Sequence, residues 1–380
     1  MYLLFQRGAD PNISNYKGKT ALMDASCNSE VDKACLLLEN GANIHAKDEN
    51  GWTSFIWAMH GQYWARNTPC TDIMRVLVKY GADVNTQAKD GSTALIIASN
   101  NGRTNHVQML LENYKVDVNI KNKYGKSALM GASNKGHLDT VRVLLEHGYS
   151  LTHLTLLTHS SNLTYSLRAC SNAQAKDGKT SLMFACYRGK IDVVRLLLEK
   201  GADQSIRAKD GATPLLWATS GNRSDILQLL LENGGNINVQ DENGETALIK
   251  AAIKGNQDAK LIRLLLENGA DPYIKDNKGR NAISVAKTPI IKKIIKRLSN
   301  WKRRKALMMV LAQSGYLVRL PSRTYPSTAA ASLPRPRTYP STAAASLPRS
   351  RTYPSPAAAS PSTDRVFGSL ELVKQIVSYL

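Results

Sequence analysis

Long apolar runs are absent from the sequence, and their absence excludes one class of protein. No stretch approaches the roughly 18 consecutive apolar residues that a transmembrane helix needs. Residues 1–10, MYLLFQRGAD, are too short and wrongly flanked for a secretory signal peptide. The five cysteines are odd in number and include no C-x-x-C pair, which argues against a disulfide framework. We therefore expect reduced thiols, no transmembrane segment, and a cytoplasmic or nuclear location.

Motifs for catalysis, metal binding and phosphate binding are absent as well. The seven histidines are scattered, no H-E-x-x-H motif occurs, and His153 and His159 have no further ligands nearby. The glycine-containing turns lack the G-x-x-x-x-G-K frame of a phosphate-binding loop. The sequence therefore predicts no enzymatic activity, no cofactor and no metal site.

Acidic residues are scarce in the last quarter of the chain, and this explains the net charge of +20. Residues 287–380 hold 17 Lys and Arg against two Asp and Glu, whereas residues 1–286 hold 33 against 28. Residues 1–286 are therefore nearly neutral for a segment of that length. A basic tail alone would bind nucleic acid without sequence preference and in a salt-sensitive manner. We expect no specific nucleic-acid partner.

A repeat of 33 residues organises most of the chain. Residues 178–210 read GKTSLMFACYRGKIDVVRLLLEKGADQSIRAKD, and residue 211 begins the same pattern again. Glycines open successive copies at positions 18, 51, 91, 125, 178, 211, 244 and 279. Self-similarity at such a period indicates a solenoid of stacked supersecondary units, because one unit alone cannot bury its apolar face.

Each copy predicts two helices followed by a turn. A threonine two residues after the opening glycine is suited to cap a short apolar helix. A second glycine ends that helix, and a second helix carries apolar residues at helical spacing. A Gly-Ala-Asp segment, as at Gly201, stops the second helix, because glycine tolerates the left-handed C-cap conformation.

These residues resemble the ankyrin repeat. The matching motifs are G-x-T-x-L-x-x-A, an inter-helix glycine and V-x-L-L-L-E-x-G-A-D, recurring eight times over residues 15–298. Residues 213–215 keep the family's T-P-L, but its following histidine is replaced, mostly by an apolar residue. The resemblance implies an all-α ankyrin-repeat solenoid with short hairpins. It further implies a monomeric, non-enzymatic scaffold that binds an unidentified partner protein through its concave face and hairpin tips.

The predicted array covers residues 1–298, with a truncated first copy and two insertions. Residues 1–10 align with the second helix of a repeat, so we expect a truncated gene model or a fragment. Extra residues near 62–71 and 151–172 lengthen two intervals, and insertions in repeat proteins form loops. The longer insertion lacks clear periodicity, which favours an irregular loop or a degenerate repeat.

One position, here called the variable slot, differs strongly between copies. Four residues after the repeat threonine, the copies carry Asp24, Trp57, Ile97, Gly131, Phe184, Trp217 and Lys250. Because an unpaired buried charge is costly, a slot that accepts Asp and Lys cannot be wholly buried in every copy. The resemblance places this slot on the concave face.

The aromatic residues of the variable slot are our predicted partner contacts. We predict that Trp57, Phe184 and Trp217 bind a partner together with Tyr187 and Arg188, since aromatic and arginine side chains are favoured at interface hot spots. Adjacent normal copies should bring Phe184 and Trp217 into one patch. The alternative is that these rings pack against neighbouring repeats.

The basic segment after the array leaves three interpretations open. Residues 287–305 contain nine Lys and Arg and no acid. A nuclear import signal would have its core at Lys302, Arg303, Arg304 and Lys305. The other interpretations are an amphipathic basic helix for an acidic membrane surface or a partner groove, and a solvated cap with a basic linker. We expect a basic helical extension over residues 299–320.

The C-terminal residues predict a spacer and a final helix. Residues 321–363 repeat a 14-residue unit rich in Pro, Ala and Ser with Arg, which cannot bury a core, so we expect a disordered spacer. Residues 364–380 regain helical spacing and predict a terminal amphipathic helix that packs back on the array. This segment faintly resembles the first helix of an F-box. Two other functions therefore stay open: a substrate-recruiting adaptor of a ubiquitin ligase, and a nuclear regulatory protein.

Overall fold

The computed structural model describes residues 2–60, 71–114, 116–146, 171–255 and 259–300. The chain divides into two compact units, residues 1–299 and 300–380, and the described residues belong almost wholly to the first. The two predicted insertions lie almost entirely outside the described residues. The nuclear import tract, the spacer, the terminal helix and nearly all of the basic extension lie outside them too.

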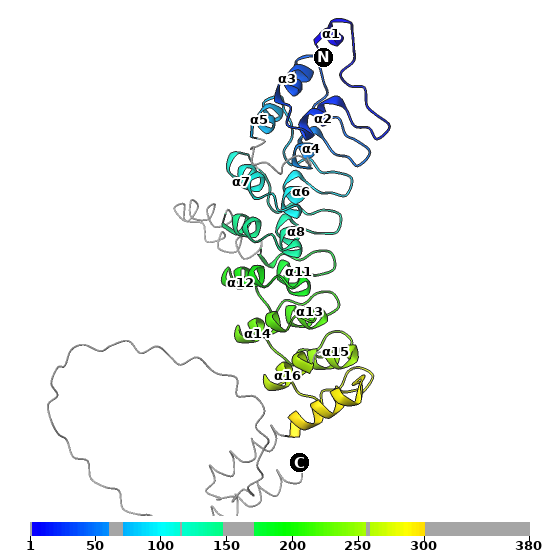
Figure 1. Ribbon diagram of the computed structural model, residues 1–380, viewed down its shortest axis with the longest axis vertical. Helices are drawn as coiled ribbons and strands as arrows, with labels where there is room; N and C mark the ends of the chain where they lie inside the picture. Colours follow the sequence, from blue (N-terminus) through cyan, green and yellow to red (C-terminus); the bar gives the residue numbers. More distant parts are fainter. Residues whose placement is uncertain (1, 61–70, 115, 147–170, 256–258, 301–380) are drawn as a thin grey trace, which may run out of the picture. The chain divides into compact units, whose positions relative to one another are not determined.

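The first unit consists of helix pairs stacked in order along the chain (Figure 1). Its first-helix row contains α2 (Ala21–Cys27), α4 (Ser54–His60), α6 (Ala94–Asn100), α8 (Ala128–Lys135), α11 (Ser181–Arg188), α13 (Pro214–Ser220) and α15 (Ala247–Lys254). Its second-helix row contains α3 (Val31–Glu39), α5 (Thr71–Lys79), α7 (Thr104–Asn113), α12 (Ile191–Glu199), α14 (Ser224–Glu232) and α16 (Ala259–Glu267), with residues 138–146 helical as well. A short helix, α1 (Tyr2–Gln6), precedes them. The predicted all-α ankyrin-repeat architecture is confirmed, and within the described residues the only β pairing is an isolated bridge between Ser14 and Thr20.

The predicted caps explain where the first helices begin and end. The hydroxyls of Thr20, Thr93 and Thr180 each accept the backbone N–H of the residue three positions later, as N-cap residues do. Gly136 and Gly189 end α8 and α11 in the left-handed conformation, with φ of 86° and 76°. These short helices are thus delimited by local sequence, although their stability comes from stacking.

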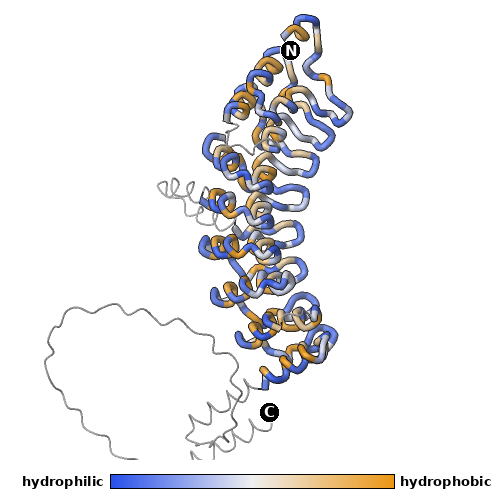
Figure 2. The backbone as a smooth tube through the Cα atoms, in the orientation of Figure 1, coloured by the Kyte–Doolittle hydropathy of each residue, from blue (hydrophilic) through white to orange (hydrophobic). Residues whose placement is uncertain are grey.

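Stacking buries one continuous apolar core from Leu22 to Ile295. Apolar residues occupy the position after the T-P-L motif where the resembled family has histidine, and each is at most 1% exposed: Met23, Ile56, Ile96, Met130, Met183, Leu216 and Ile249. Burying a side chain of this size contributes about 1.5–3 kcal/mol. The exchange of a polar residue for an apolar one therefore preserves stacking. Figure 2 shows the corresponding pattern, with hydrophobic colour concentrated on the helices and hydrophilic colour along the hairpins.

The hairpins stay in register along the array. A side chain of each hairpin donates a hydrogen bond to the main-chain oxygen of the equivalent residue in the next hairpin. The series runs through Lys47, Gln87, Lys121, Gln174, Arg207, Gln240 and Lys275. A backbone ladder runs beside it, for example from Lys209 N to Asp177 O at 3.0 Å. Both series cross the longer insertion, so stacking is unbroken there.

The last copy differs from the others in its first helix. Residues 282–284 form a turn in place of a helix, and a helix then covers residues 289–300. Asn281 replaces the capping threonine, and Asn281 and Ser284 exchange hydrogen bonds of 2.9 and 3.0 Å. These reciprocal bonds have the geometry of a capping box, but the turn that they open does not continue into a helix.

Candidate protein-binding surface

The variable slot is partly accessible, as its sequence variation predicts. Asp24 is exposed, and Trp57, Phe184, Trp217 and Lys250 are half-buried. Ile97 and Gly131 are buried. The slot therefore borders the surface, and its exposure depends on the size of the residue and on what covers it.

In the second copy, the slot residue Trp57 is held from several sides. Its indole Nε1 donates a hydrogen bond of 3.1 Å to Oδ2 of the buried Asp48. The Lys19 ammonium lies 4.3 Å from the centroid of the Trp57 ring, and Trp52 meets the ring edge-on at 5.1 Å. His60 contacts both indoles, and burial lowers the pKa of its imidazole. These contacts leave Trp57 in one orientation with limited exposure.

Lysines cover the aromatic slot residues of the fifth and sixth copies in the same way. Lys126 lies 5.0 Å from the centroid of the Phe184 ring, and Lys179 lies 4.4 Å from that of Trp217. Each lysine belongs to the copy that precedes the ring it covers, and it stands directly before the residue that caps the first helix of its own copy. Cation–π contacts of this kind contribute about 0.5–1 kcal/mol at exposed sites. Sequence reasoning missed these lysines, although their shared position beside the cap was a visible signal.

Tyr187 and Arg188 lie at the exposed end of α11. Tyr187 is 43% exposed and its ring meets Trp217 edge-on, with centroids 5.6 Å apart. The Arg188 guanidinium lies 5.9 Å from the Tyr187 ring, and its Nε donates a hydrogen bond of 3.1 Å to Oδ1 of Asn134. This arrangement presents an aromatic and a cationic group together, the combination typical of binding hot spots.

The structure brings together only part of the predicted patch. Tyr187, Arg188 and Trp217 form a contiguous group, whereas Phe184 has no ring contact with Trp217 within the described residues. Trp217 also packs against the apolar core, in line with the alternative that these rings pack between repeats. Trp57 lies in the second copy, apart from the others. That these five residues bind a partner stays a prediction.

The seventh copy replaces the slot aromatic with the half-buried Lys250, which is paired with two acidic side chains. Lys250 Nζ lies 2.6 Å from Asp241 Oδ2 and 3.2 Å from Glu245 Oε2. Burial by itself would lower the pKa of Lys250, but hydrogen bonds and charge from Asp241 and Glu245 outweigh burial and raise it. This copy therefore offers no aromatic group and little free charge at the slot.

The described part of the chain contains neither a metal-binding cluster nor a membrane-spanning helix. No group of three or more His, Cys, Asp or Glu there is arranged to hold a metal ion. None of the helices within those ranges combines the length and apolar character required to cross a bilayer. The hairpin and first-helix surface is thus the candidate functional surface that the described residues support.

Comparison with known proteins agrees with this architecture. A family model described as ankyrin repeats (3 copies) matches residues 1–88, 62–155, 153–241 and 224–304. The potassium channel AKT2/3 of Arabidopsis thaliana is 28% identical over 132 residues, which is 28% of this chain and 16% of the channel. The B-cell lymphoma 3 protein homolog of Mus musculus is 34% identical over 103 residues, covering 27% of this chain and 21% of that protein. This chain therefore spans only a small share of the relatives that it matches.

One similar solved structure is the ankyrin repeat domain of Bcl-3, described as a unique member of the IkappaB protein family. The alignment covers 74% of this chain and 99% of the Bcl-3 chain, with 21% sequence identity and a TM-score of 0.49. The family matches together extend over residues 1–304, most of the chain, and the described helices of this region form the paired rows of the solenoid. The chain belongs to the ankyrin-repeat family.

Proposed function

We propose that this chain is a non-enzymatic scaffold that binds a partner protein through its hairpins and first-helix row. The observation that carries the proposal is the exposed group of Tyr187 and Arg188 beside Trp217. Hydrogen bonds between hairpins hold the surrounding surface in one geometry, so binding would cost little ordering entropy. The chain would act as a monomer in the cytoplasm or the nucleus, without a cofactor.

Substitution of the exposed anchors tests this proposal without disturbing the core. We expect Tyr187→Ala combined with Arg188→Ala to abolish retention of a specific protein from an extract of the source cells. A matched control, Arg195→Ala combined with Gln228→Ala on the second-helix row, should retain it. Circular dichroism should show unchanged helicity in both variants. If every protein retained by the wild type is also retained by the anchor variant, the proposed surface is wrong.

A further inference from the structure

The array is nearly neutral in total, but its basic and acidic residues are unevenly distributed along residues 1–286. Four equivalent 17-residue segments, each a hairpin with its first helix, form the centre of the candidate surface: 87–103, 121–137, 174–190 and 207–223. These central segments hold 13 Lys and Arg against three Asp. The rest of residues 1–286 holds 20 basic and 25 acidic residues. The centre of the candidate surface is therefore cationic, and the rest of the array is weakly acidic.

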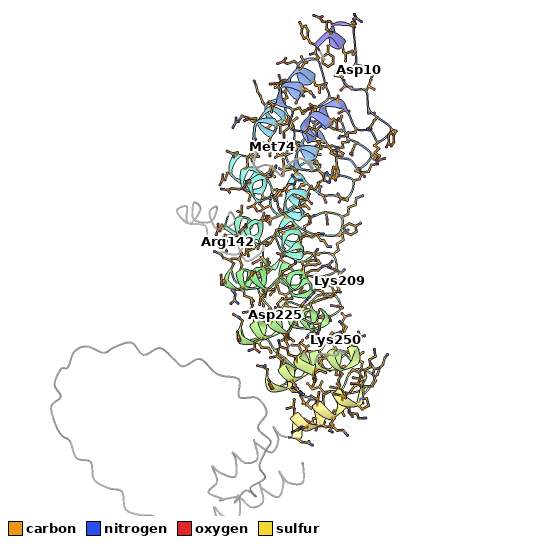
Figure 3. The ribbon with its side chains drawn as sticks, in the orientation of Figure 1. Asp10, Met74, Arg142, Lys209, Asp225 and Lys250 are labelled. Carbon is orange, nitrogen blue, oxygen red and sulfur yellow. The ribbon has the colours of Figure 1, made fainter. Side chains whose placement is uncertain are left out.

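A row of four lysines follows the tips of the central hairpins. Lys89, Lys123, Lys176 and Lys209 each stand two residues before the glycine that opens a copy, and all four side chains are exposed. None of the four forms an ion pair with another described residue. Figure 3 places Lys209 on the hairpin side of the ribbon and Arg142 on the side of the second helices. This lysine row thus presents its charge away from the acidic second helices.

Backbone bonding fixes the lysine row in register. Each lysine N–H donates to a carbonyl oxygen in the preceding hairpin, at distances of 2.8, 2.8, 3.0 and 3.0 Å from Lys89 to Lys209. The same bond crosses the longer insertion, between Lys176 N and Tyr124 O. Glutamates take the equivalent position in the copies on either side, at Glu49 and Glu242. The row therefore has a defined length of four copies and an acidic residue at each end.

From this row we infer that the partner presents an acidic, extended polypeptide segment that lies along the central hairpins. The inference rests on the proposed function and narrows the chemistry of the partner. Packed helices lie about 8–10 Å apart, so successive lysines should be separated by a similar distance. An extended peptide in the polyproline II conformation has three residues per turn and advances about 3.1 Å per residue, so every third residue returns to the same face and meets a new lysine. The matching segment carries an acidic residue at every third position, over about ten residues.

The charges beside the row favour such a peptide over nucleic acid. Asp90, Asp177 and Asp210 directly follow three of the four lysines and are exposed at the same tips. Their carboxylates are held in place by backbone N–H groups, for example Asp210 by Ala212 N at 3.0 Å. Each strand of a DNA duplex carries a phosphate about every 3.4 Å of helix axis and would place charge against these aspartates as well as the lysines. A peptide with spaced acids avoids that repulsion.

Two labelled peptides and two double variants of the full chain test the inference. The spaced peptide has a glutamate at every third position, and the clustered peptide has the same composition with its glutamates adjacent. The row variant carries Lys123→Glu and Lys176→Glu. The control variant carries Lys79→Glu and Arg142→Glu, two exposed positions on the second-helix row, and has the same net charge. The basic tail is identical in both variants.

Fluorescence anisotropy at about 0.15 M salt should show the wild type binding the spaced peptide more tightly than the clustered one. We expect the row variant to lose about tenfold in affinity for the spaced peptide and the control variant less than about twofold. Equal losses in the two variants, or no preference between the peptides, would overturn the inference. Tighter binding of single-stranded DNA that the row variant abolishes would instead assign the row to nucleic acid.

The same proteins separate a failure of this inference from a failure of the proposed function. A row variant that loses the peptide but still retains a protein dependent on Tyr187 and Arg188 would refute the acidic segment and leave the scaffold function intact. Loss of that protein in the row variant, with the control variant unaffected, would support both.

Discussion

The opening glycines of the copies allow a sharp test of how the hairpins stack. Gly178 has φ of +79°, and a Cβ added to it would lie 2.6 Å from the backbone nitrogen of Lys209 in the next hairpin. Gly201, after the second helix of the same copy, has φ of +77°, but an added Cβ would meet nothing within 4 Å. Alanine at either position is strained by the positive φ. Only at Gly178 must the next hairpin also move.

The expected magnitudes follow from this difference. The left-handed conformation costs an alanine about 1–2 kcal/mol, partly offset by about 0.4–1 kcal/mol from a more restricted unfolded chain. Gly201→Ala should therefore reduce the free energy of unfolding by about 1 kcal/mol. Gly178→Ala should also break the bonds from Lys209 N to Asp177 O and from Gln174 Nε2 to Arg207 O. At about 1 kcal/mol each, its total effect is about 3 kcal/mol.

Urea unfolding followed by circular dichroism and by tryptophan fluorescence measures both variants. The comparison is internal, because the two substitutions have the same chemistry and nearly the same φ. If Gly178→Ala and Gly201→Ala destabilise the chain equally, the close approach of neighbouring hairpins is not what requires glycine at the start of each copy.

Three further outcomes are expected. Ala208→Asp should stabilise the chain by about 1 kcal/mol, because its carboxylate would accept the buried indole N–H of Trp217, which has no acceptor among the described residues. In the same urea titration, Ala175→Asp should destabilise the chain, because the slot residue of that copy, Phe184, has no N–H to donate. Burial raises the pKa of the Cys186 thiol, so peptide mass spectrometry after brief N-ethylmaleimide treatment should find it unmodified until urea is added. Burial and the charge of a neighbouring arginine lower the pKa of His106 to about 4. Because the unfolded state then binds the proton more readily than the folded state, the free energy of unfolding should fall as the pH drops from about 6.5 to about 4. His106→Gln should remove that part of the pH dependence.

Much of the fold could be predicted from the sequence because its signals are local. The threonine hydroxyl that caps a first helix lies within three residues of the N–H that it accepts, as Thr180 does for Met183. Apolar residues recur at helical spacing within each copy, and the copies recur at a fixed period. The last copy, where Asn281 replaces the threonine, is an exception and forms only a turn in place of its first helix.

The candidate surface was only partly predictable. Variation at the slot indicated an accessible position and drew attention to Trp57, Phe184 and Trp217. The sequence could not show that Phe184 and Trp217 lack a ring contact, or that Trp217 contacts Tyr187, because these arrangements depend on side-chain orientation in the stack. The charge summed along residues 1–286 is likewise nearly neutral, and this sum does not distinguish the cationic central segments from the rest of the array.

The sequence by itself determined the repeating unit, its helix boundaries and the family to which the chain belongs. Only the tertiary structure decided which lysine lies over which ring and which lysines form one row. The physical reason is that helix caps and apolar periodicity act within one copy, whereas the contacts of Lys126 and Lys179 join one copy to the next. Stacking converts equivalent positions in successive copies into neighbours in space, and so separates a cationic hairpin surface from an acidic remainder.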